Sequence, residues 1–189
     1  MKFIAMKYKF CLVVFLFLLV SCEKDWLKNC FIKDKEFSIK LTTYTENELR
    51  IDGYYYRDCS DNYSHIFVFY ANGVRFGGSE VITTIDIEDR LRYSDFTKRY
   101  DRLSCWGPFE INNNVLRFEF YDIFGNNWHT CIAHCKILND TIFNIEKITF
   151  SKTGEEVNVD RQGTSSGLIG EFRFKQFSPK PDSTNNFIK

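Results

Sequence analysis

The densest group of metal-binding residue types is the stretch HTCIAHC, which contains His129, Cys131, His134 and Cys135. Imidazole and thiolate groups are the ligands that zinc takes in proteins, usually in tetrahedral sets of four. On a β-strand, however, alternate side chains point to opposite faces, so His134 faces away from the other three. The paired Cys-x-x-Cys spacing of a zinc knuckle is also absent. We therefore expect no metal ion at this stretch, and no cofactor is indicated elsewhere.

The other residues that could support an enzymatic reaction lie in unsuitable contexts. Residues 163–167 (GTSSG) lack the strand-to-helix context in which a serine nucleophile is presented. The glycines at 77–78 lack the lysine and the helix of a phosphate-binding loop. Glu110, Glu119 and Asp122 are acidic, but their places in alternating stretches predict a solvated face. The sequence therefore predicts a protein that is not an enzyme, and a metal-dependent enzyme that uses His129, Cys131 and Cys135 is the less favoured alternative.

The N-terminal segment has the composition of a signal peptide. Lys2, Lys7 and Lys9 come before the uncharged run CLVVFLFLLV at residues 11–20. A membrane-spanning helix needs about 20 apolar residues, whereas the apolar part of a signal peptide has about 7–15. We therefore expect residues 1–21 to be a signal peptide rather than a transmembrane helix.

The residues that end this run, Leu19-Val20-Ser21-Cys22, resemble the lipobox of bacterial lipoproteins. This resemblance implies that the Cys22 thiol receives a diacylglyceryl group and becomes the new N-terminus. The charged residues 23–25 resemble the surface-export signal of lipoproteins in Bacteroides-type bacteria. We therefore expect a lipid-anchored segment at 22–36 and attachment to the outer membrane through acyl chains, facing the periplasm or the surface. The alternative is a cysteine just beyond an ordinary secretory cleavage site.

The composition of the mature chain limits its partners and its redox chemistry. Removal of 1–21 takes away three lysines and no acidic residue, so 25 basic and 25 acidic residues become a net charge of −3 over 168 residues. That balance argues against a nucleic-acid partner, and it does not identify a protein partner. Apart from Cys22, five cysteines remain, an odd number whose pairing cannot be deduced from spacing. They are Cys30, Cys59, Cys105, Cys131 and Cys135.

The clearest structural unit is a hairpin, because Asn72-Gly73 separates two apolar runs and both residues tolerate positive φ. We expect strands at 65–71 and 74–80 on either side of it. Residues 82–103 differ: Tyr93, Phe96, Tyr100 and Leu103 repeat at helical spacing, so we expect a helical or irregular insertion. A strand at 84–88 is the alternative there. Further strands are expected at 49–58, 106–111, 115–121, 128–138, 141–150, near 156–161 and at 171–177.

Eight or nine strands in meander order predict an all-β, antiparallel, lipocalin-like (calycin-type) barrel over residues 37–178, followed by an irregular tail at 179–189. A β-sandwich is the competing architecture. Gly53-Tyr54-Tyr55 is similar to the Gly-x-Trp strand of lipocalin-like barrels, with Tyr55 at the tryptophan position. The stretches DGYYY, YANG, WGPFEI, CKILNDTIFNI and FKQFSPKPDSTNNFI resemble a group of small lipoproteins of undefined function from Bacteroides-type bacteria.

The abundance of aromatic residues suggests what the barrel holds. They either line a cavity for a small apolar ligand or simply fill the interior. The first possibility predicts a non-enzymatic binding module for such a ligand or for an envelope partner, and the second predicts an interaction or inhibitory lipoprotein with a packed barrel and an exposed aromatic patch. Asp140-Thr141-Ile142 and Asp182-Ser183-Thr184 resemble the O-glycosylation signal of such bacteria, with Thr141 and Ser183 as acceptors. The candidate ligand-lining residues are Tyr55, Phe67, Phe69, Trp106, Phe118 and Phe120.

Overall fold

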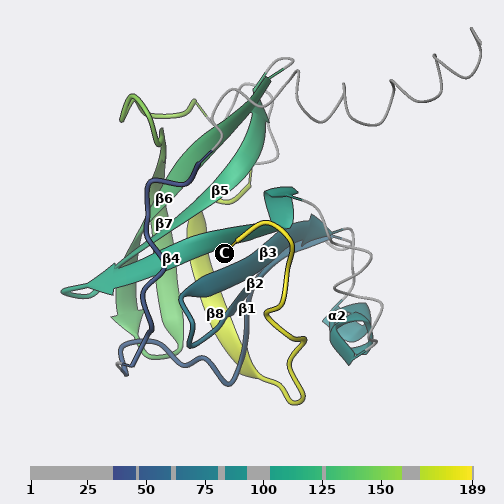
Figure 1. Cartoon of the computed structure of the whole chain (residues 1–189). Coiled ribbons are helices and arrows are strands. Elements are labelled where there is room, and N and C mark those ends of the chain that lie inside the picture. Colours follow the sequence, from purple (N-terminus) through teal and green to yellow (C-terminus); the bar gives the residue numbers. More distant parts are fainter. Residues whose placement is uncertain are drawn as a thin grey trace, which may run out of the picture. The chain divides into compact units, whose positions relative to one another are not determined.

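The computed structural model is a closed barrel of eight antiparallel strands in which each strand pairs with its neighbours in sequence, and the last strand pairs with the first (Figure 1). It describes residues 36–45, 47–60, 63–80, 84–92, 103–124, 127–158 and 167–188. The expected meander barrel is therefore confirmed. The elements are β1 (Gly53–Ser60), β2 (Tyr63–Phe69), β3 (Val74–Glu80), helix α2 (Thr84–Arg92), the 3-10 helix η1 (Leu103–Cys105), β4 (Trp106–Asn112), β5 (Val115–Phe124), β6 (Asn127–Asn139), β7 (Ile142–Phe150) and β8 (Gly170–Gln176).

Tight turns set the register of the hairpins. Asn113 and Asn114 both have positive φ, 52° and 62°, in the two-residue turn between β4 and β5, as a type I′ turn requires. Gly73 has a φ of 80°, and a Cβ there would lie 2.3 Å from the carbonyl oxygen of Thr42. Glycine is therefore needed at the β2–β3 turn both for the backbone conformation and for the chain that passes over it.

The inner face of the barrel carries one continuous apolar core. Along β5, Leu116, Phe118 and Phe120 point inward and are buried. The inward faces of the other strands supply further buried apolar side chains. We call this whole set, together with the buried residues that close the barrel ends, the interior cluster. Its buried members are Leu49, Tyr55, Phe67, Phe69, Phe109, Leu116, Phe118, Phe120, Cys131, Ala133, Cys135, Ile137, Phe143, Ile145, Ile148, Val157, Leu168 and Phe172.

A second apolar cluster, which we call the outer cluster, lies on the outside of β1–β4. Ile87 and Leu91, one helical turn apart on α2, pack against it, and Phe177 anchors the C-terminal segment there. That segment runs without helix or strand over β1–β3 (Figure 1). Its Lys180 amine donates to the carbonyls of Ile51 and Phe69, the latter at 2.9 Å. The outer wall is thus covered rather than exposed along this part of the barrel.

Residues 36–45 form a strap that crosses the outside of the barrel before the chain enters β1. The buried carboxylate of Glu119 accepts hydrogen bonds from the backbone N–H of Ser38 at 2.6 Å and of Ile39 at 2.8 Å. Farther along, the Tyr44 N–H donates to the carbonyl of Ala71 at 2.8 Å. The expected solvated face for Glu119 is therefore wrong, because the strap covers its strand. Asp122 is buried as well, while Glu110 stays partly exposed and paired with a basic side chain.

Two expected strands differ in extent. The first begins at Gly53 rather than at 49, because residues 47–52 cross the end of the barrel, where the Arg50 N–H bonds the Asp140 carbonyl at 2.9 Å. Near 156–161, the described residues 156–158 show an isolated bridge at Glu156 and no strand. We call the barrel end covered by residues 44–45 and 47–52 the strap end.

The insertion between β3 and β4 is helical where the structure describes it, over Thr84–Arg92. The alternative of a strand at 84–88 is wrong, because these residues belong to the α-helix, in which Ile87 and Leu91 lie one turn apart and pack on the same apolar cluster. Tyr93, Phe96 and Tyr100 lie outside the described residues. Among the residues described, no helix has the length and apolar character needed to cross a membrane.

Candidate functional site

Five of the six residues predicted to line a ligand cavity face the interior and touch one another. Tyr55, Phe67, Phe69, Phe118 and Phe120 belong to the interior cluster, and none is more than 6% exposed. Their rings contact their neighbours at centroid distances such as 4.9 Å for Phe67–Phe118 and 5.7 Å for Tyr55–Phe69. The side chains themselves therefore occupy this part of the barrel, as close-packed protein interiors do.

Trp106 lies in the outer cluster rather than in the interior. Its ring meets that of Phe76 at 5.0 Å, edge to face, and stacks on Tyr70 at 6.4 Å. Alternation explains the placement, because Gly107 and Phe109 are the inward positions of β4. The tryptophan therefore joins the barrel wall to the C-terminal cover.

Arg75 is a buried cation inside this apolar interior. It is 2% exposed, and its guanidinium carbon lies 5.4, 5.0 and 5.8 Å from the ring centroids of Phe67, Phe118 and Phe120. Its Nε and Nη2 have no hydrogen-bond partner among the described residues. Burial lowers the pKa of Arg75 to about 10, so the three aromatic faces are its main electrostatic compensation.

The hairpin pattern did not identify Arg75 as an inward-facing residue. It stands between Val74 and Phe76 in the expected strand at 74–80, for which no inward face was predicted. In the barrel those neighbours face the outer cluster, and Arg75 alternates inward with Gly77. A Cβ at Gly77 would lie 2.3 Å from Arg75 Nη1. The sequence signal for this placement was Gly77, which lies two residues from Arg75 and therefore on the same face of the strand.

The stretch HTCIAHC does not bring its four candidate ligand residues together. Cys131 and Cys135 are buried in the interior cluster, whereas His134 points outward, with its Nε2 3.0 Å from Thr149 Oγ1. Burial lowers the pKa of His134 and raises that of Cys135 well above its usual value. In the part of the chain that the structure describes, no group of three or more His, Cys, Asp or Glu side chains is placed to hold a metal ion.

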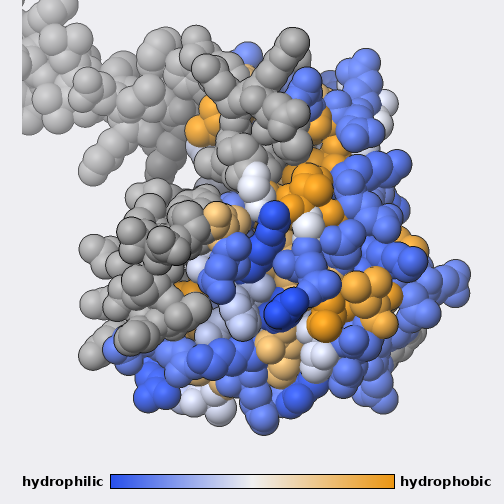
Figure 2. All heavy atoms as spheres, turned by 180° about the vertical axis from the view of Figure 1, so that it is seen from behind, coloured by the Kyte–Doolittle hydropathy of each residue, from blue (hydrophilic) through white to orange (hydrophobic). Residues whose placement is uncertain are grey.

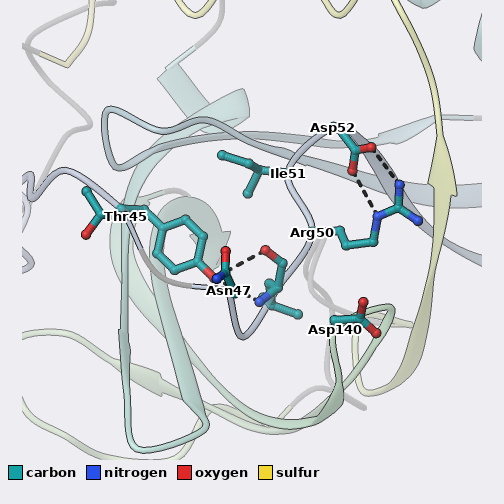
Figure 3. A pocket seen from close by; sticks show the side chains of 8 residues that line it. Thr45, Asn47, Arg50, Ile51, Asp52 and Asp140 are labelled. Atoms are coloured by element: carbon teal, nitrogen blue, oxygen red, sulfur yellow. Dashed lines mark hydrogen bonds and ion pairs between the residues drawn. The ribbon is translucent and has the colours of Figure 1, made fainter.

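An open pocket of about 540 Å³ lies at the strap end of the barrel (Figure 3). This volume falls within the range of ligand pockets, about 300–1,000 Å³. Its walls come from the segment that leads into β1 and from the turn between β6 and β7. The lining residues, which define the strap-end pocket, are Tyr44, Thr45, Asn47, Leu49, Arg50, Ile51, Asp52 and Asp140.

Hydrogen bonds to backbone groups fix both walls of this pocket. The Tyr55 hydroxyl donates to the carbonyls of Arg50 at 3.1 Å and of Asp140 at 2.9 Å, so it joins the two walls. Burial raises the pKa of Tyr55, which keeps the hydroxyl protonated. The Tyr44 hydroxyl accepts from the Leu49 N–H at 2.8 Å and closes the loop between them. These hydrogen bonds hold the two walls of the pocket together without a ligand.

Arg50 is held on both sides at the rim of the strap-end pocket. Its Nε and Nη2 donate to the two carboxylate oxygens of Asp52 at 3.0 and 2.6 Å (Figure 3). Its guanidinium carbon lies 4.5 Å from the centroid of the Phe174 ring. The hydrogen bond from Arg50 is the main cause of the lowered pKa of Asp52, and the same bond raises the pKa of Arg50.

The two predicted glycosylation positions lie in local turns. Thr141 donates from its N–H and its hydroxyl to Asn139 Oδ1 at 2.9 and 2.7 Å. The Ser183 hydroxyl accepts from Asn72 at 3.1 Å. Both residues are partly buried, and their modification stays a prediction.

The exposed apolar surface differs from the expected aromatic patch. Among the described residues, the large hydrophobic side chains that are exposed are aliphatic: Leu41, Val115, Ile123 and Leu138. Figure 2 shows separate hydrophobic areas, in orange, among hydrophilic side chains on the face opposite to that of Figure 1. A packed barrel in this protein therefore does not present an aromatic platform on its described surface.

Cys22, the predicted point of lipid attachment, lies outside the described residues, as do Cys30 and the rest of the N-terminal segment up to residue 35. Comparisons with protein-family models, with curated proteins and with solved structures found no match to this chain. The candidate sites therefore depend on the geometry described above.

Proposed function

We propose that this protein is a lipid-anchored binding protein of the bacterial cell envelope, whose packed barrel serves as a scaffold and whose contacts are made at its surface. The observation that carries the proposal is the filled interior. The fully buried rings of Phe69, Phe118, Phe143 and Phe172 are each at most 1% exposed. Such rings leave no water-sized space beside them, so a ligand inside would have to displace them.

The anchoring part of the proposal depends on the sequence. The residues Leu19 to Cys22 follow the uncharged run directly, as a lipobox would, and two or three acyl chains give stable attachment because each buried methylene contributes about 0.8 kcal/mol. We place the protein at the outer membrane on this ground, with the barrel in the periplasm or at the surface.

A second candidate function is the capture of a small apolar ligand within the barrel. Arg75 favours it, because among the described residues its buried Nε and Nη2 have no hydrogen-bond partner, and a buried cation is costly unless an anion pairs with it. Under this alternative the ligand would be an apolar acid whose carboxylate or phosphate meets the guanidinium among the Phe67, Phe118 and Phe120 rings. Those rings would have to separate to admit it.

Native mass spectrometry of the full chain, followed by lipid extraction, separates the two functions. If the barrel is packed, any non-covalently bound molecule should dissociate from the protein at low activation energy. The extract should then contain no stoichiometric lipid beyond the anchor. A stoichiometric apolar acid, lost in an Arg75→Met variant, would establish the second candidate instead.

Metabolic labelling with palmitate tests the anchor on its own. Label should be incorporated in the wild type and lost in Cys22→Ala, which should also leave the membrane fraction. The matched control is Cys59→Ala, which removes an exposed thiol from the barrel and should change neither result. Label retained in Cys22→Ala would contradict the assignment of Cys22.

A further inference from the structure

The strap-end pocket has polar groups of every hydrogen-bonding type around one opening. Arg50 offers donors only, the carboxylates of Asp52 and Asp140 offer acceptors only, and Asn47 and Thr45 offer both. Figure 3 shows Arg50, Asp52 and Asp140 on one side of the view and Thr45 on the other, with Asn47 between them. A ligand seated here must therefore present donors and acceptors at neighbouring positions.

The charges of the pocket nearly cancel. Two carboxylates stand against one guanidinium, and the Lys180 amine, which bonds the Ile51 carbonyl beside the pocket, acts electrostatically on Asp52. Asp52 already occupies the Nε and Nη2 donors of Arg50, and the carboxylates of Asp52 and Asp140 would repel an anion at the donors that remain. Neither an anionic ligand nor a strongly cationic one is favoured by this arrangement.

Asp140 supplies the acceptor that the fold leaves available. Its carbonyl oxygen accepts two hydrogen bonds, from the Arg50 N–H and the Tyr55 hydroxyl, which fix the turn. Its carboxylate is exposed and makes no hydrogen bond or ion pair with the residues that the structure describes. A fixed backbone under an unused carboxylate lowers the entropy lost when a ligand binds.

From these features we propose that the strap-end pocket binds a neutral, polyhydroxylated ligand of the carbohydrate class. A hydroxyl group donates and accepts at once, so neighbouring hydroxyls can accept from Arg50 Nη1 and donate to the Asp140 carboxylate. Ile51 and Tyr44, which line the pocket, supply apolar surface for the carbon faces of a sugar ring. The inference rests on the proposed function, since it names the surface at which the binding protein makes its contact.

The test is a printed array of neutral, amino and acidic oligosaccharides probed with the labelled full chain, followed by calorimetric titration of the strongest neutral member. We expect retention on neutral members, with a dissociation constant at or below about 1 mM. Asp140→Ala and Arg50→Ala should each weaken binding at least about tenfold, one factor of ten being a single well-placed hydrogen bond. An array on which no member binds, or on which acidic members bind best, would overturn the inference.

The barrel offers a matched control outside the pocket. Arg173 and Glu171 on β8 form the same kind of exposed pair, two residues apart, with Nε 2.9 Å from the carboxylate. Arg173→Ala and Glu171→Ala should bind the selected sugar like the wild type, and an equal loss in these variants would refute the role of the pocket. Circular dichroism of each variant shows whether the barrel is folded, and Asp140→Asn, which keeps the side-chain shape, replaces Asp140→Ala if that variant unfolds.

The two proposals fail separately. Sugar binding that depends on Asp140, together with a lipid found inside the barrel, would remove the packed-scaffold proposal and keep the pocket. A barrel free of lipid, together with a silent array, would remove the pocket and keep the scaffold.

Discussion

Arg75 in the barrel interior and Arg50 at the strap end have opposite surroundings. Arg75 is 2% exposed and lies among three phenylalanine rings, and burial lowers its pKa. The Arg50 side chain is 36% exposed and is bound by both oxygens of Asp52, which raises its pKa. Arg75 is removed from water and has no carboxylate partner among the residues that the structure describes, whereas Arg50 keeps both water and a carboxylate.

This contrast separates the structural part of the barrel from the part suited to recognition. Removing an ion from water costs several kcal/mol of solvation free energy. Contacts with aromatic rings, worth about 0.5–2 kcal/mol each, offset that cost only in part. A paired and hydrated arginine costs little and can still donate to a ligand from its remaining nitrogen. The interior is thus the region where substitutions change stability, and the strap end is the region where they change binding.

The largest expected effect is the loss of an interior ring. Phe143 is 0% exposed, stacks on Phe172 with ring centroids 5.2 Å apart, and meets Tyr55 at 5.1 Å. Phe143→Ala should lower the free energy of unfolding by about 3–5 kcal/mol, since it removes buried area and leaves a cavity. Leu138→Ala, at a position 49% exposed, should change it by at most about 0.5 kcal/mol. Urea denaturation measures both, and a loss below about 1 kcal/mol in Phe143→Ala would mean that the interior is loosely filled.

Arg75→Met should have a smaller effect of the opposite sign. Methionine fills a similar volume without a charge, so the free energy of unfolding should rise by about 1–4 kcal/mol. Arg75→Lys keeps the charge but loses the planar face that stacks on the rings, and it should destabilise the barrel. Urea denaturation of the two variants compares them directly. A fall in stability in Arg75→Met would show that the cation is compensated, by the rings or by a bound anion.

The sequence predicted the barrel well because its signals are local. Asn72-Gly73 and the asparagines at 113–114 determine turns by their backbone preferences alone, and the alternation along β5 identifies the inward residues. A helical insertion was expected within 82–103 from the spacing of Tyr93, Phe96, Tyr100 and Leu103, and the described helix lies just before that stripe, over Thr84–Arg92.

The sequence could not predict what depends on distant partners. Glu119 looks like a solvated residue until the strap, some 80 residues away, covers it. Trp106 looks like a core residue, and it is one, but in the outer cluster that α2 and the C-terminal segment complete. The strap-end pocket is likewise made by residues 44–45, 47 and 49–52 together with Asp140, which the Tyr55 hydroxyl and the Arg50 N–H connect across the barrel end. Signals of this kind are long-range, and a single sequence does not carry them.

The smallest expected effect concerns Lys180, the cation that lies between the two extremes. Its amine donates to the carbonyls of Ile51 and Phe69 and lies 4.8 Å from the Tyr70 ring centroid, and burial lowers its pKa to about 8, against a weak opposing influence from Asp52. Because the folded state holds this proton less tightly than the unfolded chain, the unfolded chain binds more protons between about pH 8 and 10.5. The burial cost is therefore fully present below pH 8 and disappears as the pH rises through that window. Urea denaturation of wild type and Lys180→Met from pH 7.5 to 10 should show the stability of the wild type rising relative to the variant, since other groups titrate alike in both. A relative fall would mean that the carbonyls and Asp52 stabilise the ammonium more than burial destabilises it, and that the rim tolerates a charge as readily at Lys180 as at Arg50.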